Sequence, residues 1–126
     1  MGTHNPTRLL VVGSSADELR ILRLLFPEWI VCRAKSASEA QVCLQSAPVT
    51  AILTERDLPD GGWKDVLLSE MPERPIPPAV VISAQADDRL WSEVLNLGGH
   101  DVLLKPLDPA EVLRVLHTAV RRSACA

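Results

Sequence analysis

Three side chains of complementary chemistry stand at the ends of apolar runs in this sequence. Glu55 follows the run 51–54, Ser83 ends the run 79–83, and Lys105 follows the run 102–104. A carboxylate can accept charge-assisted hydrogen bonds from an ammonium group and from a hydroxyl. Since no nucleophile–base pair accompanies them, the chemistry that these residues support is ion pairing and oxyanion binding, not covalent catalysis.

Apolar runs of strand length alternate with helical patterns along the chain, which predicts a parallel sheet covered on both faces. Capping signals place helix starts at Ser15 with Glu18, at Ser36 with Glu39 and at Asp108 with Pro109. The predicted strands are 8–12, 29–32, 49–54, 79–83 and 102–104. The predicted helices are 15–26, 36–46, 63–71, 87–97 and 108–122, and residues 58–62 are predicted as a loop.

Five β/α units with short connections and right-handed crossovers predict a single α/β domain. The fold class is a flavodoxin-like (βα)5 doubly wound parallel sheet with strand order 2-1-3-4-5, covering residues 1–126 with a folded core of 8–122. Ligands of such folds gather at the carboxyl ends of the strands. Glu55, Ser83 and Lys105 are therefore expected to lie together at one edge of the sheet.

The order of these strand ends resembles the response-regulator receiver domain, the phosphoacceptor half of two-component signalling. In that family an aspartate stands four residues before the loop proline, and here Glu55 stands four residues before Pro59. An acidic pair that holds magnesium follows the first strand in the family, whereas Gly13 and Ser14 occupy those positions here. The resemblance thus implies a receiver that has lost its metal ligands.

The resemblance also assigns roles to Ser83 and Lys105, which hold phosphoryl oxygens in the family, and implies a cis peptide bond before Pro106. The longer Glu55 could mimic the phosphorylated state by contacting both Lys105 and Ser83, or it could only neutralise Lys105. We leave both readings open at this point. Asp57 is a possible substitute acceptor, but two residues of extended chain shift a carboxylate by about 6.6 Å, so a turn-forming role is the better interpretation.

Val102 stands three residues before the lysine, where the family has a switch tyrosine or phenylalanine. A short β-branched side chain cannot reproduce a large rotameric swing. The predicted fourth helix places Leu90, Val94 and Leu97 on one stripe, with Trp91 and Leu95 on a second. The second stripe marks a possible contact for a protein partner, the chain's own output domain or a second copy, although a wide core-facing stripe explains it as well.

Composition excludes several classes of function. The net charge of −3 gives no reason to expect nucleic-acid binding, no apolar run suits a membrane span, and three scattered cysteines predict free thiols in a cytoplasmic protein. No metal, cofactor or catalytic residue is expected. The favoured hypothesis is a phosphorylation-independent signalling and protein-interaction module that is not an enzyme. The alternatives are a phosphoaccepting receiver, which would need a metal-binding carboxylate near Glu55, and a small-molecule-binding flavodoxin-like domain.

Overall fold

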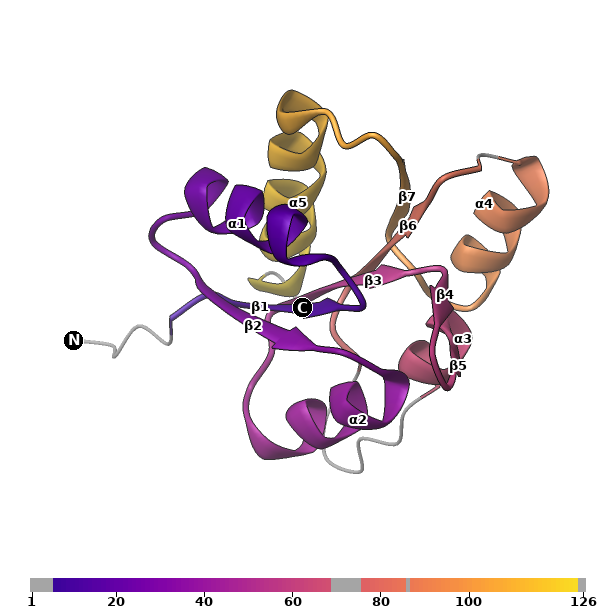
Figure 1. Ribbon diagram of the computed structural model, residues 1–126, viewed down its shortest axis with the longest axis horizontal. Coiled ribbons are helices and arrows are strands. Elements are labelled where there is room, and N and C mark those ends of the chain that lie inside the picture. The colour runs from indigo at the N-terminus through magenta and orange to yellow at the C-terminus, as the bar shows by residue number, and fades with distance from the viewer. Residues whose placement is uncertain (1–5, 69–75, 86, 125–126) are drawn as a thin grey trace.

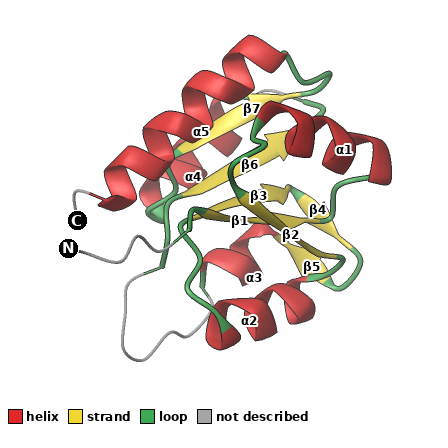
Figure 2. Ribbon diagram, turned by 90° about the vertical axis from the view of Figure 1, so that its left-hand side faces the viewer, coloured by secondary structure: helices red, strands yellow, loops and turns green. Residues whose placement is uncertain are grey.

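The computed structural model describes residues 6–68, 76–85 and 87–124. At its centre lies a five-stranded parallel sheet in the order β2-β1-β3-β6-β7, with helices on both faces (Figures 1 and 2). The five strands of this sheet are β1 Arg8–Val12, β2 Ile30–Ala34, β3 Ala51–Glu55, β6 Ala79–Ser83 and β7 Asp101–Leu104. The predicted fold class and strand order are confirmed.

Two helices cover one face of the sheet and three cover the other. The core beneath the first face joins Leu19 and Leu22 of α1 (Ala16–Leu25) to Val112 and Leu116 of α5 (Pro109–Ala124). The second core is formed with α2 (Ala37–Ser46), α3 (Trp63–Leu67) and α4 (Asp88–Asn96). Because β1, β3 and β6 are buried on both sides, their sequences are continuously apolar rather than alternating.

The helix starts follow the predicted capping signals. Ser15 forms a complete capping box with Glu18, and the Ser36 hydroxyl accepts the backbone N–H of Glu39. The second box is incomplete because the Glu39 carboxylate accepts the N–H of Lys35 rather than that of Ser36. The Glu39 carboxylate thus accepts the N–H of Lys35, a residue outside the helix, and the helix still begins where predicted.

Several details of the prediction are wrong. The helical pattern of residues 36–46 predicts Val42 as a core contact, and the apolar stripe of the fourth helix predicts the same of Leu97, but Val42 is 62% exposed and Leu97 is 41% exposed. For Leu97 the reason is that α4 ends at Asn96, so Leu97 leaves the helical stripe. The predicted loop contains a two-residue antiparallel hairpin, β4 (Asp57–Leu58) with β5 (Gly61–Gly62). The third helix ends at Leu67, and the end predicted at Met71 lies outside the described residues.

Candidate functional site

The carboxyl ends of β3 and β7 bring Glu55 and Lys105 into direct contact. Lys105 Nζ lies 2.6 Å from Glu55 Oε1, which is the distance of a strong charge-assisted hydrogen bond. Glu55 is 16% exposed and Lys105 is 32% exposed, so the pair is only partly screened by water. The Lys105–Pro106 peptide bond is cis, as the resemblance implied. The structure therefore confirms that these two residues meet.

A second carboxylate, which the sequence analysis treated only as a helix cap, reaches the same lysine. Glu18 Oε2 of α1 lies 3.3 Å from Lys105 Nζ, while its Oε1 accepts the backbone N–H and the hydroxyl of Ser15. One ammonium group thus bridges two carboxylates from different elements. The signal in the sequence was the capping box itself, because it places Glu18 in the first turn of the helix that follows β1.

The three groups shift one another's ionisation. Burial raises the pKa of the Glu55 carboxyl, and the hydrogen bond and charge of Lys105 offset only part of that rise. Burial also acts to raise the pKa of Glu18, but the Ser15 backbone and Lys105 outweigh it, so that pKa is lowered. Burial opposes the charge on Lys105, yet both carboxylates favour it and raise the pKa of the ammonium.

Glycine at position 13 allows the stem of Glu55 to occupy its observed place. Gly13 has φ +82°, and a Cβ built there would lie 2.6 Å from Leu58 Cδ2 and 3.1 Å from Glu55 Cγ. Leu58 and Glu55 therefore fill the space that a side chain at position 13 would take. Beside it, Ser14 is buried, and its hydroxyl has no hydrogen-bond partner in the described part of the chain. The Ser14 carbonyl accepts a hydrogen bond from Arg33 Nη2 at 3.1 Å.

Among the described residues, no hydrogen bond joins Ser83 to Glu55. The Ser83 hydroxyl donates to the carbonyl of Gln85 at 2.8 Å and accepts the N–H of Gln85 at 3.1 Å. The second oxygen of the carboxylate, Glu55 Oε2, is buried and has no hydrogen-bond partner within the ranges that the structure describes. Of the two contacts that mimicry of a phosphoryl group would use, the structure has the one with Lys105, whereas the Ser83 hydroxyl is bonded to its local backbone instead.

Asp57 is directed to solvent rather than to Lys105. It belongs to β4, its side chain is exposed, and its Oδ2 pairs with Arg56 Nη2 at 3.2 Å. Together with Glu55, Ser83 and Lys105 it lines a cavity of about 220 Å³ at the ends of the strands. These four predicted site residues therefore share one cavity, while the direct contact is between Glu55 and Lys105.

The donor set at this place does not fit magnesium. Magnesium in proteins is anchored by oxygen ligands, usually carboxylates. Gly13 and Ser14 offer no carboxylate, and Glu18 and Glu55 are both engaged by Lys105. Across the ranges that the structure describes, no group of three or more His, Cys, Asp or Glu residues is placed to hold a metal ion. Cys32 and Cys43 are free thiols, while Cys125 lies outside those ranges.

The predicted switch and interaction positions lie on and beside α4. Val102 is half-buried against the core under α4, while Trp91 is 51% exposed and Leu95 is also exposed. The indole N–H of Trp91 donates to Asp101 Oδ1 at 3.4 Å, which links α4 to β7. Leu104 of β7 adds a further exposed apolar side chain. The second apolar stripe therefore faces outward rather than into the core.

In the described part of the chain, no helix is long and apolar enough to cross a membrane. No family model matches the sequence. The chain is 30% identical over 88 residues to the response regulator protein PilR of Pseudomonas aeruginosa, which is 70% of this chain but only 20% of the length of PilR. It is 27% identical over 112 residues to an uncharacterized 14.6 kDa protein of Leptolyngbya boryana from the sodA1 3′ region, covering 86% of each.

Solved receiver-domain structures share the fold along nearly the whole chain. The signal receiver domain of an HD domain-containing protein from Pseudomonas fluorescens Pf-5 superposes with a TM-score of 0.85 at 22% identity, covering 99% of this chain and 94% of that one. A CheY-like response regulator receiver domain protein from Methanospirillum hungatei JF-1 gives a TM-score of 0.82 at 20% identity, covering 95% and 98%. The chain has the fold of response-regulator receiver domains.

Proposed function

We propose that this chain is a receiver-like signalling module that acts through protein contacts and does not depend on phosphorylation. The observation that carries the proposal is the 2.6 Å ion pair between Lys105 and Glu55, reinforced by Glu18 at 3.3 Å. The lysine that would hold a phosphoryl oxygen is already neutralised by the protein's own carboxylates. An incoming phosphoryl group would meet two negative charges with no metal to offset them.

Of the two readings of Glu55, the geometry favours neutralisation of Lys105 over mimicry of a phosphoryl group. A phosphoryl group would offer three acceptor oxygens, whereas Glu55 uses one oxygen on Lys105 and leaves Oε2 unpaired. Ser83 is held by Gln85 and makes no contribution. The module would therefore rest in a single conformation, set by the ion pair rather than by a bound phosphoryl group.

The surface formed by α4, β7 and α5 is the proposed contact for a protein partner, an output domain or a second copy. Trp91, Leu95 and Leu104 expose apolar area there, and exposed apolar patches mark interaction surfaces. Val102 stands where the family has an aromatic switch residue, so no large side-chain swing at this position would alter the surface. We further propose a cytoplasmic, non-enzymatic protein that uses no cofactor and binds neither nucleic acid nor membrane through this domain.

A phosphoaccepting receiver is the second candidate, and one observation supports keeping it. That function needs a metal-binding carboxylate near Glu55, and Glu18 lies close enough to share Lys105 with it. Lys105 would have to leave Glu18 before a metal ion could bind there. Phosphorylation would therefore require the ion pair between Lys105 and Glu18 to break, whereas a phosphorylation-independent module would keep it.

Incubation with magnesium and acetyl phosphate separates the two candidates. We expect no protein-bound phosphoryl signal in the ³¹P NMR spectrum, with a receiver that retains its acidic pair as the positive control. A phosphoryl resonance that disappears in a Glu55→Gln variant would establish a phosphoacceptor and overturn the leading proposal. The variant also serves as the control for phosphorylation at other side chains.

A further inference from the structure

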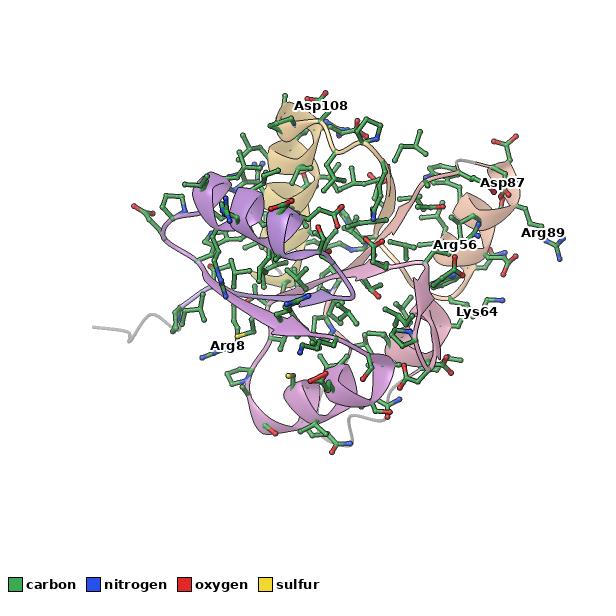
Figure 3. The ribbon with its side chains drawn as sticks, viewed as in Figure 1. Arg8, Arg56, Lys64, Asp87, Arg89 and Asp108 are labelled. Atoms are coloured by element: carbon green, nitrogen blue, oxygen red, sulfur yellow. The ribbon has the colours of Figure 1, made fainter. Side chains whose placement is uncertain are left out.

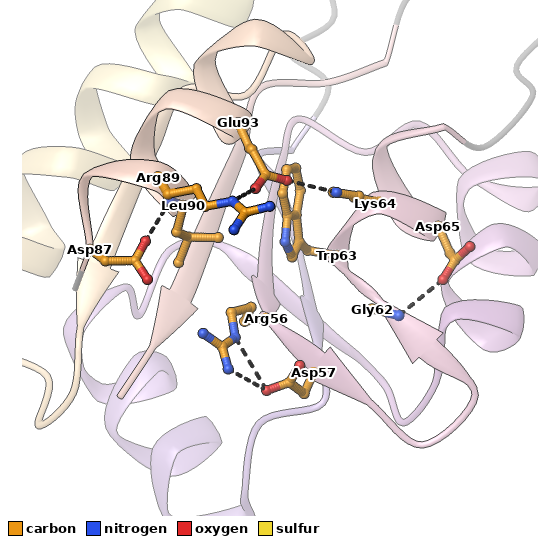
Figure 4. A pocket seen from close by; sticks show the side chains of 10 residues that line it. All are labelled: Arg56, Asp57, Gly62, Trp63, Lys64, Asp65, Asp87, Arg89, Leu90 and Glu93. Carbon is orange, nitrogen blue, oxygen red and sulfur yellow. Dashed lines mark hydrogen bonds and ion pairs between the residues drawn. The ribbon is translucent and has the colours of Figure 1, made fainter. Parts of the chain in front are cut away.

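A second cavity, larger than the one beside Lys105, lies between α3, α4 and the β4–β5 hairpin. Its volume is about 500 Å³, within the range of small-molecule sites. Arg56, Lys64 and Arg89 lie on the same side of the molecule (Figure 3), and in the close-up view their charged ends surround this cavity with Trp63 at its wall (Figure 4). Nothing in the proposed signalling role uses it.

The carboxylates around the cavity are already engaged. Glu93 accepts from Lys64 Nζ at 2.6 Å and from Arg89 Nε at 3.4 Å, and these contacts lower the pKa of Glu93. Asp87 caps α4 by accepting the N–H of Leu90. Asp57 pairs with Arg56. The acidic side chains thus hold the walls in place.

The arginines keep donors that are not used. Arg56 binds Asp57 through Nε and Nη2, and Arg89 contacts Glu93 through Nε. Within the described residues, no hydrogen bond or ion pair uses Nη1 of Arg56 or either Nη group of the exposed Arg89. A guanidinium presents donors in a planar fork that matches a carboxylate, so these groups can take a further acceptor.

The apolar part of the wall limits the kind of ligand. Trp63 and Leu90 are buried side chains whose edges line the cavity between the cations. A ligand that fills this space would therefore meet apolar side chains as well as cations. The lining carries four carboxylates against three cations, so a singly charged carboxylate is tolerated better than a doubly charged phosphate.

We propose that the cavity between α3 and α4 binds a small organic anion that carries a carboxylate and a planar apolar body. The carboxylate pairs with Arg56 and Arg89, and the apolar body packs on Trp63 and Leu90. The cavity shares Arg56 and Asp57 with the cavity beside Glu55. The site is independent of whether Glu55 accepts a phosphoryl group.

The test uses a pair of probes that differ in charge. Indole-3-acetate carries the carboxylate and tryptamine replaces it with an ammonium group on the same ring system. We expect indole-3-acetate to shift the indole N–H of Trp63 and the Nε–H of Arg56 and Arg89 in ¹⁵N-edited NMR spectra, with a dissociation constant of about 1 mM. Tryptamine and inorganic phosphate are expected to leave these resonances unchanged.

Two variants make the result specific. Arg89→Gln removes one of the two guanidinium groups that would bind the carboxylate. Because the Arg89 side chain is 89% exposed, the fold should be preserved, and we expect the dissociation constant of indole-3-acetate to rise about tenfold or more. Arg114→Gln, on the exposed side of α5, is the matched control and should bind like the wild type. Equal shifts with the acid and the amine, no saturation with the acid, stronger binding of phosphate, or unchanged affinity in Arg89→Gln would each overturn the proposal.

Discussion

The contribution of the Glu55–Lys105 pair to stability can be measured with a double-mutant cycle of Glu55→Gln and Lys105→Met. Exposed ion pairs contribute about 0.2–1 kcal/mol, whereas removal of one partner from a buried pair costs about 3–5 kcal/mol. With side-chain exposures of 16% and 32%, this pair lies between those limits, and we expect a coupling energy of about 1.5 kcal/mol.

Lys105→Met should lower the free energy of unfolding more than Glu55→Gln does. Glu55→Gln leaves Lys105 in contact with Glu18 and removes a carboxylate whose burial Lys105 offsets only in part, so its cost should be below about 1 kcal/mol. Lys105→Met removes the cation from both carboxylates and leaves the largely buried Glu55 side chain without its partner, so its cost should be about 2–3 kcal/mol. Urea unfolding followed by tryptophan fluorescence measures both free energies.

The exposed pair of Arg56 and Asp57 supplies the matched control, because a cycle of Arg56→Gln and Asp57→Asn should give a coupling below about 0.5 kcal/mol. If the Glu55–Lys105 coupling fell to that same level, or if Glu55→Gln cost more than Lys105→Met, the account of Lys105 as a shared cation would be refuted.

Three further predictions follow from the same site. Gly13→Ala and Gly98→Ala both place a side chain at positive φ, but only the one at position 13 would clash with Leu58 and Glu55. In urea unfolding, Gly13→Ala should therefore cost about 1–3 kcal/mol more than Gly98→Ala. Equal costs would contradict the packing of these two side chains against Gly13. In a ¹³C NMR titration of side-chain carboxyls, the pKa of Glu55 should lie above 4.5 and that of Glu18 below it, and the reverse order would contradict the assigned environments. The free energy of unfolding should therefore lose the contribution of Glu55 as the pH rises from 4.5 through the folded-state pKa of Glu55. It should lose the contribution of Glu18 as the pH falls from 4.5 through the folded-state pKa of Glu18. Glu18→Gln should lower the pKa of the Lys105 ammonium and weaken the α1 cap, at a cost of about 1 kcal/mol, and an unchanged lysine pKa by ¹⁵N NMR would remove Glu18 from the site.

The fold could be predicted closely because its signals are local and agree with one another. Apolar runs, capping boxes and short connections specify the strands, the helix starts and the order of the sheet. The errors fall where the environment is not set by local pattern. Val42 and Leu97 are apolar but exposed, and the hairpin of Leu58 with Gly61 pairs only two residues on each side.

At the site, the meeting of Glu55 and Lys105 could be predicted because both residues end parallel strands of one sheet. Two contacts could not. Glu18 approaches Lys105 from a helix, and the sequence shows only its capping role. Ser83 bonds to the backbone of Gln85, an alternative that a short hydroxyl side chain has in any loop and that sequence spacing does not reveal.

The most direct test of the central claim is an amide NMR titration with magnesium and beryllofluoride, which binds where a phosphoryl group would. Because Lys105 is held by Glu55 and Glu18 and no acidic pair is present, the account predicts no saturable shift at any amide near the site. Saturable shifts of Glu55, Ser83 and Lys105 would show that the site still receives a phosphoryl-like ligand, and would contradict a module that works without phosphorylation.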